Sequence, residues 1–120
     1  MAQVRGSAHI AATAVIIMVT MSMLFQSQVA EAAAHDVKWD YGVKLSPVTY
    51  KTGDTINFKN TDKLGHNVIK VGQAAFGKCS GQGGAAKQGP VKLESGANFF
   101  ICSVGKHCSQ GGMKIQITGN

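Results

Sequence analysis

Residues 98–118 read N-F-F-I-C-S-V-G-K-H-C-S-Q-G-G-M-K-I-Q-I-T. The two ends of this stretch, N-F-F-I-C and M-K-I-Q-I-T, are rich in branched and aromatic residues, which is typical of β-strands. The second end alternates Met113, Ile115 and Ile117 with other residues, so one face of that strand would be buried. Cys102 closes the first strand, and its sulfur would project from the sheet edge into a sheltered pocket. The stretch therefore predicts two strands joined by a loop that carries reactive side chains.

Four further segments predict short strands: residues 36–40, 55–59, 67–71 and 91–93. Turn signals separate them, among them Thr52-Gly53-Asp54 and Gly89-Pro90. No apolar stripe of helical period persists for three turns in this part of the chain. Residues 76–90 are rich in Gly, Ala and Gln, and we expect a surface loop there that contains Cys79. The sequence thus predicts an all-β fold, an antiparallel sandwich or barrel.

The N-terminal segment differs from the rest of the chain. Arg5 makes its start positive, residues 10–25 form an apolar run, and small residues follow in V-A-E-A-A-A-H. This order predicts a secretory signal peptide at residues 1–32, cleaved near residues 32–34, and a single domain at residues 33–120. The alternative is a retained membrane anchor, which the run disfavours because a spanning helix needs roughly 20 apolar residues. We therefore expect a secreted protein.

The chain has three cysteines, Cys79, Cys102 and Cys108. A small domain in an oxidising compartment is expected to contain a disulfide. The odd count then leaves one thiol, which pairs between molecules, is buried and inert, or is chemically employed.

The chain is basic, with a formal net charge of +6, and its lysines stand singly along residues 38–114. A nucleic-acid-binding protein usually shows clustered Arg and Lys with interleaved aromatics, so no nucleic-acid partner is expected. The basic surface either aids solubility or attracts an acidic protein or an anionic matrix. The C-terminus I-Q-I-T-G-N has no hydrophobic tail, so no lipid or membrane anchor is expected.

Cys102, His107 and Met113 follow one another at intervals of five and six residues. Soft thiolate and thioether groups favour Cu(I), imidazole suits Cu(II), and a trigonal set with a weak axial ligand serves both oxidation states. A second imidazole is needed, and His66, at the start of the predicted strand 67–71, is well placed to supply it. His9 leaves with the signal peptide and His35 lies at the mature N-terminus, which leaves only His66 and His107. Two histidines are too few for a three-histidine zinc site or a multicopper cluster. The sequence predicts one mononuclear copper site of His66, Cys102, His107 and Met113.

Residues 36–118 resemble the phytocyanins, the plant blue-copper family, and most of all its plantacyanin (basic blue protein) branch. The resemblance is carried by T-G-D-T-I-N-F at residues 52–58, H-N-V at 66–68, F-I-C at 100–102, H-C at 107–108 and G-M-K at 112–114. It implies a cupredoxin fold, a Greek-key β-sandwich or flattened barrel. It also implies one copper ion on the same four ligands, and an extracellular place in the apoplast or cell wall of a plant.

The resemblance implies roles for three more residues. Cys79 and Cys108 would form a disulfide, which leaves Cys102 as the metal thiolate. Asn67 would brace the metal site and tune its potential. The chain departs from the family at one step, because His107 and Met113 are six positions apart where five are usual. Gly112 looks like the added residue, which a bulge would absorb. Residues 39–52 also form a shorter segment than is usual in the family.

The function that the resemblance implies is outer-sphere transfer of one electron by a monomer that is not an enzyme. The electron would leave through the edge of His107, and residues 104–106 would help to form the docking surface for an unidentified redox partner. Two alternatives stay open. One is an extracellular copper-binding, matrix or signalling protein in which copper is structural, and the other is a disulfide-containing module without metal in which Cys102 is merely buried.

Overall fold

Residues 31–120, which the computed structural model describes, contain eight β-strands and one short helix. Their bounds are β1 (Ala34–Lys38), β2 (Val48–Tyr50), β3 (Thr55–Lys59), β4 (Val68–Val71), α2 (Gln73–Gly77), β5 (Ala85–Lys87), β6 (Val91–Lys92), β7 (Gly96–Ile101) and β8 (Lys114–Gly119). The predicted signal peptide lies outside the described residues except for its last two positions. In the described part of the chain, no helix is long and apolar enough to cross a membrane.

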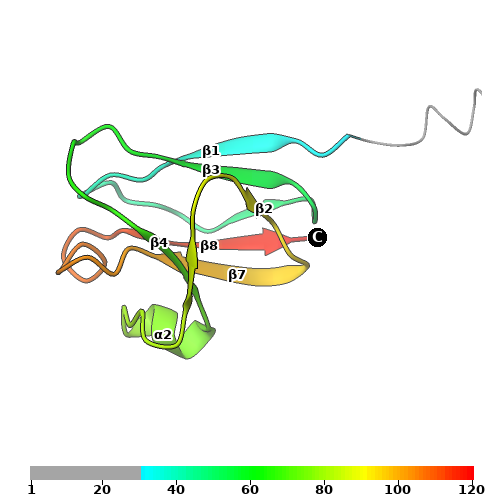
Figure 1. Cartoon of the computed structure of the whole chain (residues 1–120). Helices are drawn as coiled ribbons and strands as arrows, with labels where there is room; N and C mark the ends of the chain where they lie inside the picture. The colour runs from blue at the N-terminus through cyan, green and yellow to red at the C-terminus, as the bar shows by residue number, and fades with distance from the viewer. Residues whose placement is uncertain (1–30) are drawn as a thin grey trace, which may run out of the picture. The chain divides into compact units, whose positions relative to one another are not determined.

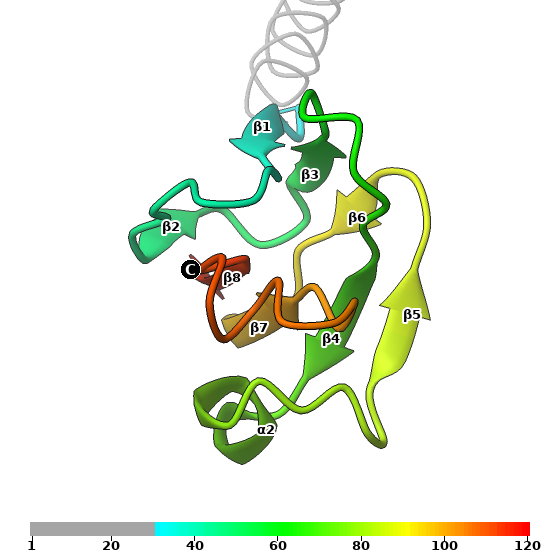
Figure 2. The same cartoon turned by 90° about the vertical axis from the view of Figure 1, so that its left-hand side faces the viewer.

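The strands form two sheets, with the orders β1-β3-β6 and β2-β8-β7-β4-β5. Figures 1 and 2 show the first sheet lying over the second in two views at right angles. Val37 of β1, Ile56 of β3, Phe100 of β7 and Ile117 of β8 belong to one buried cluster, so the sheets pack face to face. The all-β prediction is confirmed.

The expectation of an antiparallel sandwich is wrong for two strand pairs. β1 pairs with β3, and β2 with β8, in parallel, while the other four pairs are antiparallel. Parallel neighbours cannot be joined by a tight hairpin. β2 meets β8 only after the chain has passed through every other strand of the second sheet, a long-range pairing that no local pattern announces.

The core follows the alternation predicted from the sequence. Met113, Ile115 and Ile117 are all buried, and so are Val37 and Trp39. The alternate face of β4 and β7 is covered by α2, where a second cluster joins Val71, Ile101 and Cys108 with partly buried residues including Phe76 of the helix. The five-stranded sheet is therefore buried on both faces where β4 and β7 lie.

The prediction of a loop over residues 76–90 is partly wrong, because Ala85–Lys87 form the edge strand β5 against β4. Its residues are mostly exposed, so main-chain pairing rather than an apolar face holds it. Gly84 shows how closely this segment approaches β4, since a Cβ there would lie 2.5 Å from the Ile69 side chain and 2.9 Å from the Lys70 carbonyl oxygen. β2 was not predicted from the sequence either.

The disulfide implied by the family resemblance is present between Cys79, beyond α2, and Cys108, in the loop between β7 and β8. It closes a loop across a sequence separation of 29 residues. A cross-link of that span stabilises a fold by about 3 to 4 kcal/mol in the chain-entropy model. Cys102 remains a free, buried thiol.

Candidate metal centre

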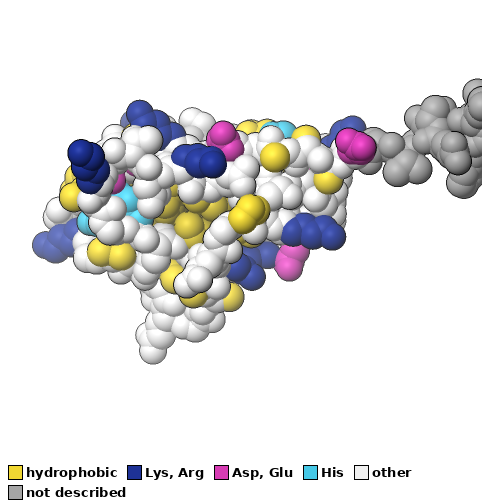
Figure 3. All heavy atoms as spheres, turned by 45° about the horizontal axis from the view of Figure 1, so that its top comes forward, with side chains coloured by type: hydrophobic (Ala, Val, Ile, Leu, Met, Phe, Trp, Pro, Cys, Tyr) yellow, Lys and Arg dark blue, Asp and Glu magenta, His cyan; other side chains and the backbone are white. Residues whose placement is uncertain are grey.

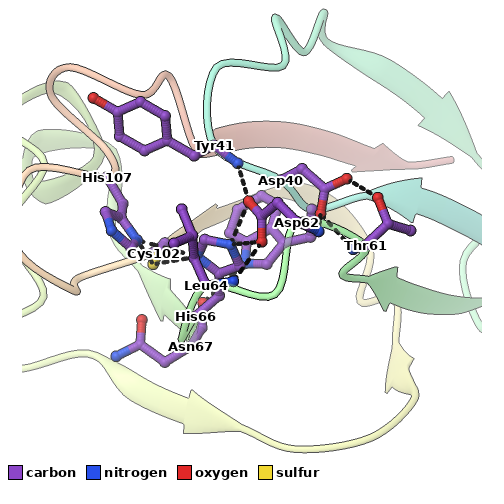
Figure 4. A network of polar contacts seen from close by, with 10 residues as sticks. Asp40, Tyr41, Thr61, Asp62, Leu64, His66, Asn67, Cys102 and His107 are labelled. Carbon is purple, nitrogen blue, oxygen red and sulfur yellow. Dashed lines mark hydrogen bonds and ion pairs between the residues drawn. The ribbon is translucent and has the colours of Figure 1, made fainter.

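Three of the four predicted ligands meet at one end of the sandwich. His66 Nδ1 lies 3.1 Å from His107 Nδ1, and Cys102 Sγ lies 3.9 Å from the first nitrogen and 3.7 Å from the second. Figure 4 shows the two rings and the sulfur pointing toward one another from different segments. Cys102 and the side chain of His66 are fully buried, while His107 is half-buried. The two histidines and the cysteine thus form a small triangle of donor atoms.

Strand pairing explains why these residues meet. β4 and β7 are antiparallel neighbours in which Ile69 faces Ile101, so the start of β4 lies beside the end of β7. His66 precedes β4 by two residues and Cys102 directly follows β7. The amide of His107 then donates to the carbonyl oxygen of Val104 at 3.0 Å, a turn that brings the imidazole back toward Cys102.

The dimensions of the triangle suit a metal ion. With metal–nitrogen bonds of about 2.0 Å and a metal–sulfur bond of about 2.3 Å, roughly trigonal angles require nitrogen–sulfur separations of about 3.7 Å and a nitrogen–nitrogen separation of about 3.1 to 3.5 Å. Two imidazole nitrogens at 3.1 Å also need a proton or a cation between them, because their lone pairs repel. Two imidazoles and one thiolate in a trigonal array are the donor set of mononuclear copper sites.

The backbone of Met113 is hydrogen-bonded to two residues of this triangle. The amide of Cys102 donates to the Met113 carbonyl oxygen, and the amide of Met113 donates to the His107 carbonyl oxygen, each at 3.0 Å. The Met113 side chain is fully buried in the cluster that contains Cys102. Gly112, which the resemblance marks as the added residue, has a φ of 68°, in the region that favours glycine. The role of Met113 as axial ligand stays a prediction.

Asp62 contacts His66, and no pattern in the sequence indicated this contact. Both of its carboxylate oxygens lie 2.8 Å from His66 Nε2, on the far side of the ring from Cys102. The amides of Tyr41 and Leu64 donate to the same carboxylate at 2.7 and 3.0 Å. Burial by itself would raise the pKa of Asp62, but the hydrogen bonds from Tyr41, His66 and Leu64 outweigh it and hold that pKa below its usual value.

Asp40 is hydrogen-bonded to the loop that contains Asp62. Its carboxylate accepts hydrogen bonds from the Thr61 amide at 2.6 Å, the Asp62 amide at 3.3 Å and the Thr61 hydroxyl. The Thr61 hydroxyl, followed by the Thr61 amide, lowers the pKa of Asp40. Asp40, Asp62 and His66 lie close enough to share a cation, with ligand atoms within 4.8 Å of one another. Their carboxylate oxygens, however, already accept hydrogen bonds from the chain, as Figure 4 shows.

Asn67 connects the two segments that carry His66 and Cys102. Its Oδ1 accepts from the Ser103 amide at 2.7 Å, and its Nδ2 donates to the Ser103 hydroxyl at 2.9 Å. Its main-chain oxygen accepts from Trp39 Nε1 at 2.9 Å. Asn67 therefore holds the residue after Cys102 in place and is itself tied to the core, while its role toward the metal stays a prediction.

Exposed apolar residues and lysines lie in the segments around the triangle. Tyr41, Leu64 and Val104 are the exposed large hydrophobic residues of the described chain. Tyr41 lies edge-on to the His107 ring with centroids 5.4 Å apart, and the other two lie in the loops that carry His66 and His107. Exposed Lys63 and Lys106 stand in the same two loops, and Figure 3 shows lysine side chains beside the histidines at this end.

Comparison with known proteins agrees with this geometry. Residues 33–112 match the model of a family described as plastocyanin-like domain. The chain is 35% identical to a chemocyanin of Lilium longiflorum and 31% identical to a basic blue protein of Arabidopsis thaliana, and each alignment covers 98% of both chains. Among solved structures it is similar to spinach plantacyanin, with 31% identity and a TM-score of 0.57. It is also similar to cucumber basic protein, described as a blue copper protein, with 28% identity and a TM-score of 0.60; each match covers 73% of this chain and all of the other. The chain therefore belongs to the plastocyanin-like family, with the cupredoxin fold, and within it to the phytocyanins.

Proposed function

We propose that this protein holds one copper ion between His66, Cys102 and His107, with Met113 as axial ligand, and that it carries single electrons. The triangle of two imidazole nitrogens and one sulfur is the observation that carries the proposal. Its relatives support the choice of metal, since the cucumber protein is described as a blue copper protein. Bound there, copper would accept and release one electron between Cu(II) and Cu(I).

The chain contributes a site whose ligands are held in place before and after the electron moves. The disulfide partner Cys108 directly follows His107, and Ser103, which directly follows Cys102, is held by the Asn67 side chain. Cys102 is 0% exposed, and this burial keeps water away from the sulfur. Ligands that are fixed by packing and hydrogen bonds need little rearrangement when the charge at the centre changes, which favours fast electron transfer.

The electron route we propose runs through His107 to the surface. This ring is half-buried and lies beside the exposed Tyr41, and exposed Val104 stands in the same loop, so an apolar partner surface can approach it closely. Lys63 and Lys106 border the same area and favour an acidic partner or an anionic matrix. In this proposal the protein is an electron carrier and not an enzyme.

We also propose secretion, with cleavage near residues 32–34. The Ala33 nitrogen lies 3.0 Å from Asp54 Oδ1 as an ordinary amide donor. Cleavage after Ala32 would make this nitrogen an ammonium in the same place, and a charged donor binds a carboxylate about twice as strongly as a neutral one. N-terminal sequencing of the protein from the extracellular medium tests this proposal, and a start outside residues 33–35 contradicts it.

The metal proposal is tested by adding Cu(II) to the metal-free protein and recording its visible spectrum. We expect an intense blue absorption from a thiolate–copper bond at one ion per chain, and its loss in Cys102→Ser. His35→Gln is the matched control, because His35 lies on β1 outside the triangle, and it should keep the band. Absence of the band in the natural protein, or its survival in Cys102→Ser, would overturn the proposal.

Voltammetry of the copper-loaded protein separates electron transfer from a structural role for copper. A carrier gives a reversible one-electron wave with fast exchange. A centre that binds copper but does not exchange electrons with small redox partners would favour the extracellular binding or signalling alternative.

A further inference from the structure

We propose that Asp62 is a positioning residue for the metal centre, because its carboxylate holds the His66 ring with a proton on Nε2 and leaves Nδ1 as the metal-binding atom. This inference rests on the proposed function, since it assigns Asp62 a role toward that same site. No local pattern in the sequence singles Asp62 out as part of the site.

The hydrogen-bond chemistry of the pair leaves one arrangement for the neutral ring. Nε2 lies 2.8 Å from both oxygens of Asp62, and an ionised carboxylate can only accept hydrogen bonds. Nε2 must therefore be the donor and carry the proton. A neutral imidazole has one such proton, so Nδ1 then presents its lone pair toward Cys102 and His107. The side chain of His66 is fully buried, so water offers no substitute partner for Nε2.

Asp62 can position His66 because it is itself held from three directions. Its oxygens accept from the amides of Tyr41 and Leu64, and its own amide donates to Asp40. The Tyr41 contact also connects the carboxylate with the second histidine, since the Tyr41 ring lies edge-on to His107. Asp62 thus contacts His66 directly, and the residue whose amide it accepts, Tyr41, contacts His107 through its ring.

Two consequences for the metal follow. A carboxylate that accepts the Nε2 proton makes the other nitrogen a better electron donor, and loss of such a partner typically weakens metal binding about 10- to 100-fold. Its negative charge also favours the more highly charged oxidation state of a nearby metal. Removing the charge should therefore raise the reduction potential even where the hydrogen bond survives.

The first experiment uses metal-free protein, so it does not depend on copper. Proton NMR with nitrogen-15 labelling at pH 8 should show a slowly exchanging His66 Nε2–H in the natural protein. We expect Asp62→Asn to keep this proton, because the amide oxygen can still accept, and Asp62→Ala to lose it. A natural protein without an Nε2–H proton, or an Asp62→Ala variant that retains it with unchanged exchange, would overturn the inference.

The second experiment measures Cu(II) affinity and reduction potential in the same variants. Asp62→Ala should bind Cu(II) about 10- to 100-fold more weakly, and Asp62→Asn should lose less affinity but shift the potential upward. Asp36→Asn is the matched control, because it removes one carboxylate charge from an exposed position on β1, and it should change neither quantity. Should Asp62→Ala fail to fold, the potential of Asp62→Asn still decides, since an unshifted potential with unchanged affinity overturns the inference.

The two proposals fail differently. If Asp62 variants match the natural protein while the blue band forms normally, the role of Asp62 is wrong and the copper proposal stands. If the Nε2–H proton behaves as expected but no blue band forms, the copper proposal is wrong and Asp62 only orients His66.

Discussion

At the scale of single residues, Met113 is a buried core residue for which we also propose the role of axial ligand, and one substitution can separate the two. Met113→Leu conserves side-chain volume in the core and removes the thioether, so folding should survive with a loss below about 1.5 kcal/mol. Loss of a weak axial donor should raise the reduction potential of the copper-loaded protein, which voltammetry measures. Leu93→Met is the reciprocal control, because Leu93 is equally buried in the same cluster. An unchanged potential in Met113→Leu would leave Met113 as a core residue alone.

Gly111 is a residue at which the loop has no room for a side chain. A Cβ there would lie 2.5 Å from the Tyr41 ring and 2.6 Å from the carbonyl oxygen of His107. Gly111→Ala should therefore destabilise the protein by about 1 to 3 kcal/mol and move Tyr41 away from His107. Urea denaturation of the metal-free protein measures the loss. Gly77→Ala, where a Cβ meets nothing within 4 Å, should be neutral, and equal effects of the two substitutions would contradict the clash.

At the scale of elements, Asp54 attaches β1 to the turn between β2 and β3. It accepts from His35 Nε2 at 2.8 Å, from the Ala33 amide at 3.0 Å and from the Lys51 amide at 3.3 Å. The His35 hydrogen bond is the main cause that holds the pKa of Asp54 below its usual value, with the amide of Ala33 next. His35 also stacks on Tyr50 of β2, with ring centroids 3.6 Å apart.

This pair predicts a pH dependence of stability. A carboxyl whose pKa is lower in the folded than in the unfolded state stabilises the fold above about pH 4, and that stability is lost as the pH falls through the folded pKa. Asp54→Asn should therefore unfold more readily than the natural protein at pH 5, and the difference should shrink as the pH falls below about 4. Urea unfolding at several pH values measures it. Asp36→Asn serves as control, and a difference that stays constant down to pH 2 would contradict the role of Asp54.

At the scale of the whole molecule, charge should govern encounters with redox partners. The formal net charge is +6, and removal of residues 1–32 would leave it unchanged, because Arg5 and Glu31 both lie there. Electron transfer to ferricyanide, an anion, should slow as ionic strength rises, and transfer with a cationic cobalt complex should accelerate, since salt screens charges beyond about 8 to 10 Å. Stopped-flow kinetics at several salt concentrations measure both rates. Equal salt dependence for the two reagents would contradict steering by the basic surface.

The comparison of sequence and structure shows which features have a local cause. The segment 55–59 was predicted with the bounds that β3 has, because Ile56 and Phe58 alternate with polar residues between clear turns. β2 and β5 could not be predicted in this way. Each is only three residues long, too short for its pattern to stand out in the sequence. β5 is mostly exposed and is held by pairing with β4, while β2 pairs with β8 and packs Val48 and Tyr50 against the core. Their existence depends on neighbours that are far away in the chain.

The features of the candidate site likewise have either a local cause or a tertiary one. The sequence by itself determined the kinds of donor atom and the alternation that buries Met113 below the loop, because both depend on residue type and on near neighbours. Only the tertiary structure decided that His66 meets Cys102 and His107 across 36 and 41 residues, that it faces them with Nδ1, and that Asp62 holds its other nitrogen. The orientation of a ring depends on the groups that surround it, and those groups come from separate strands and loops that only folding brings together.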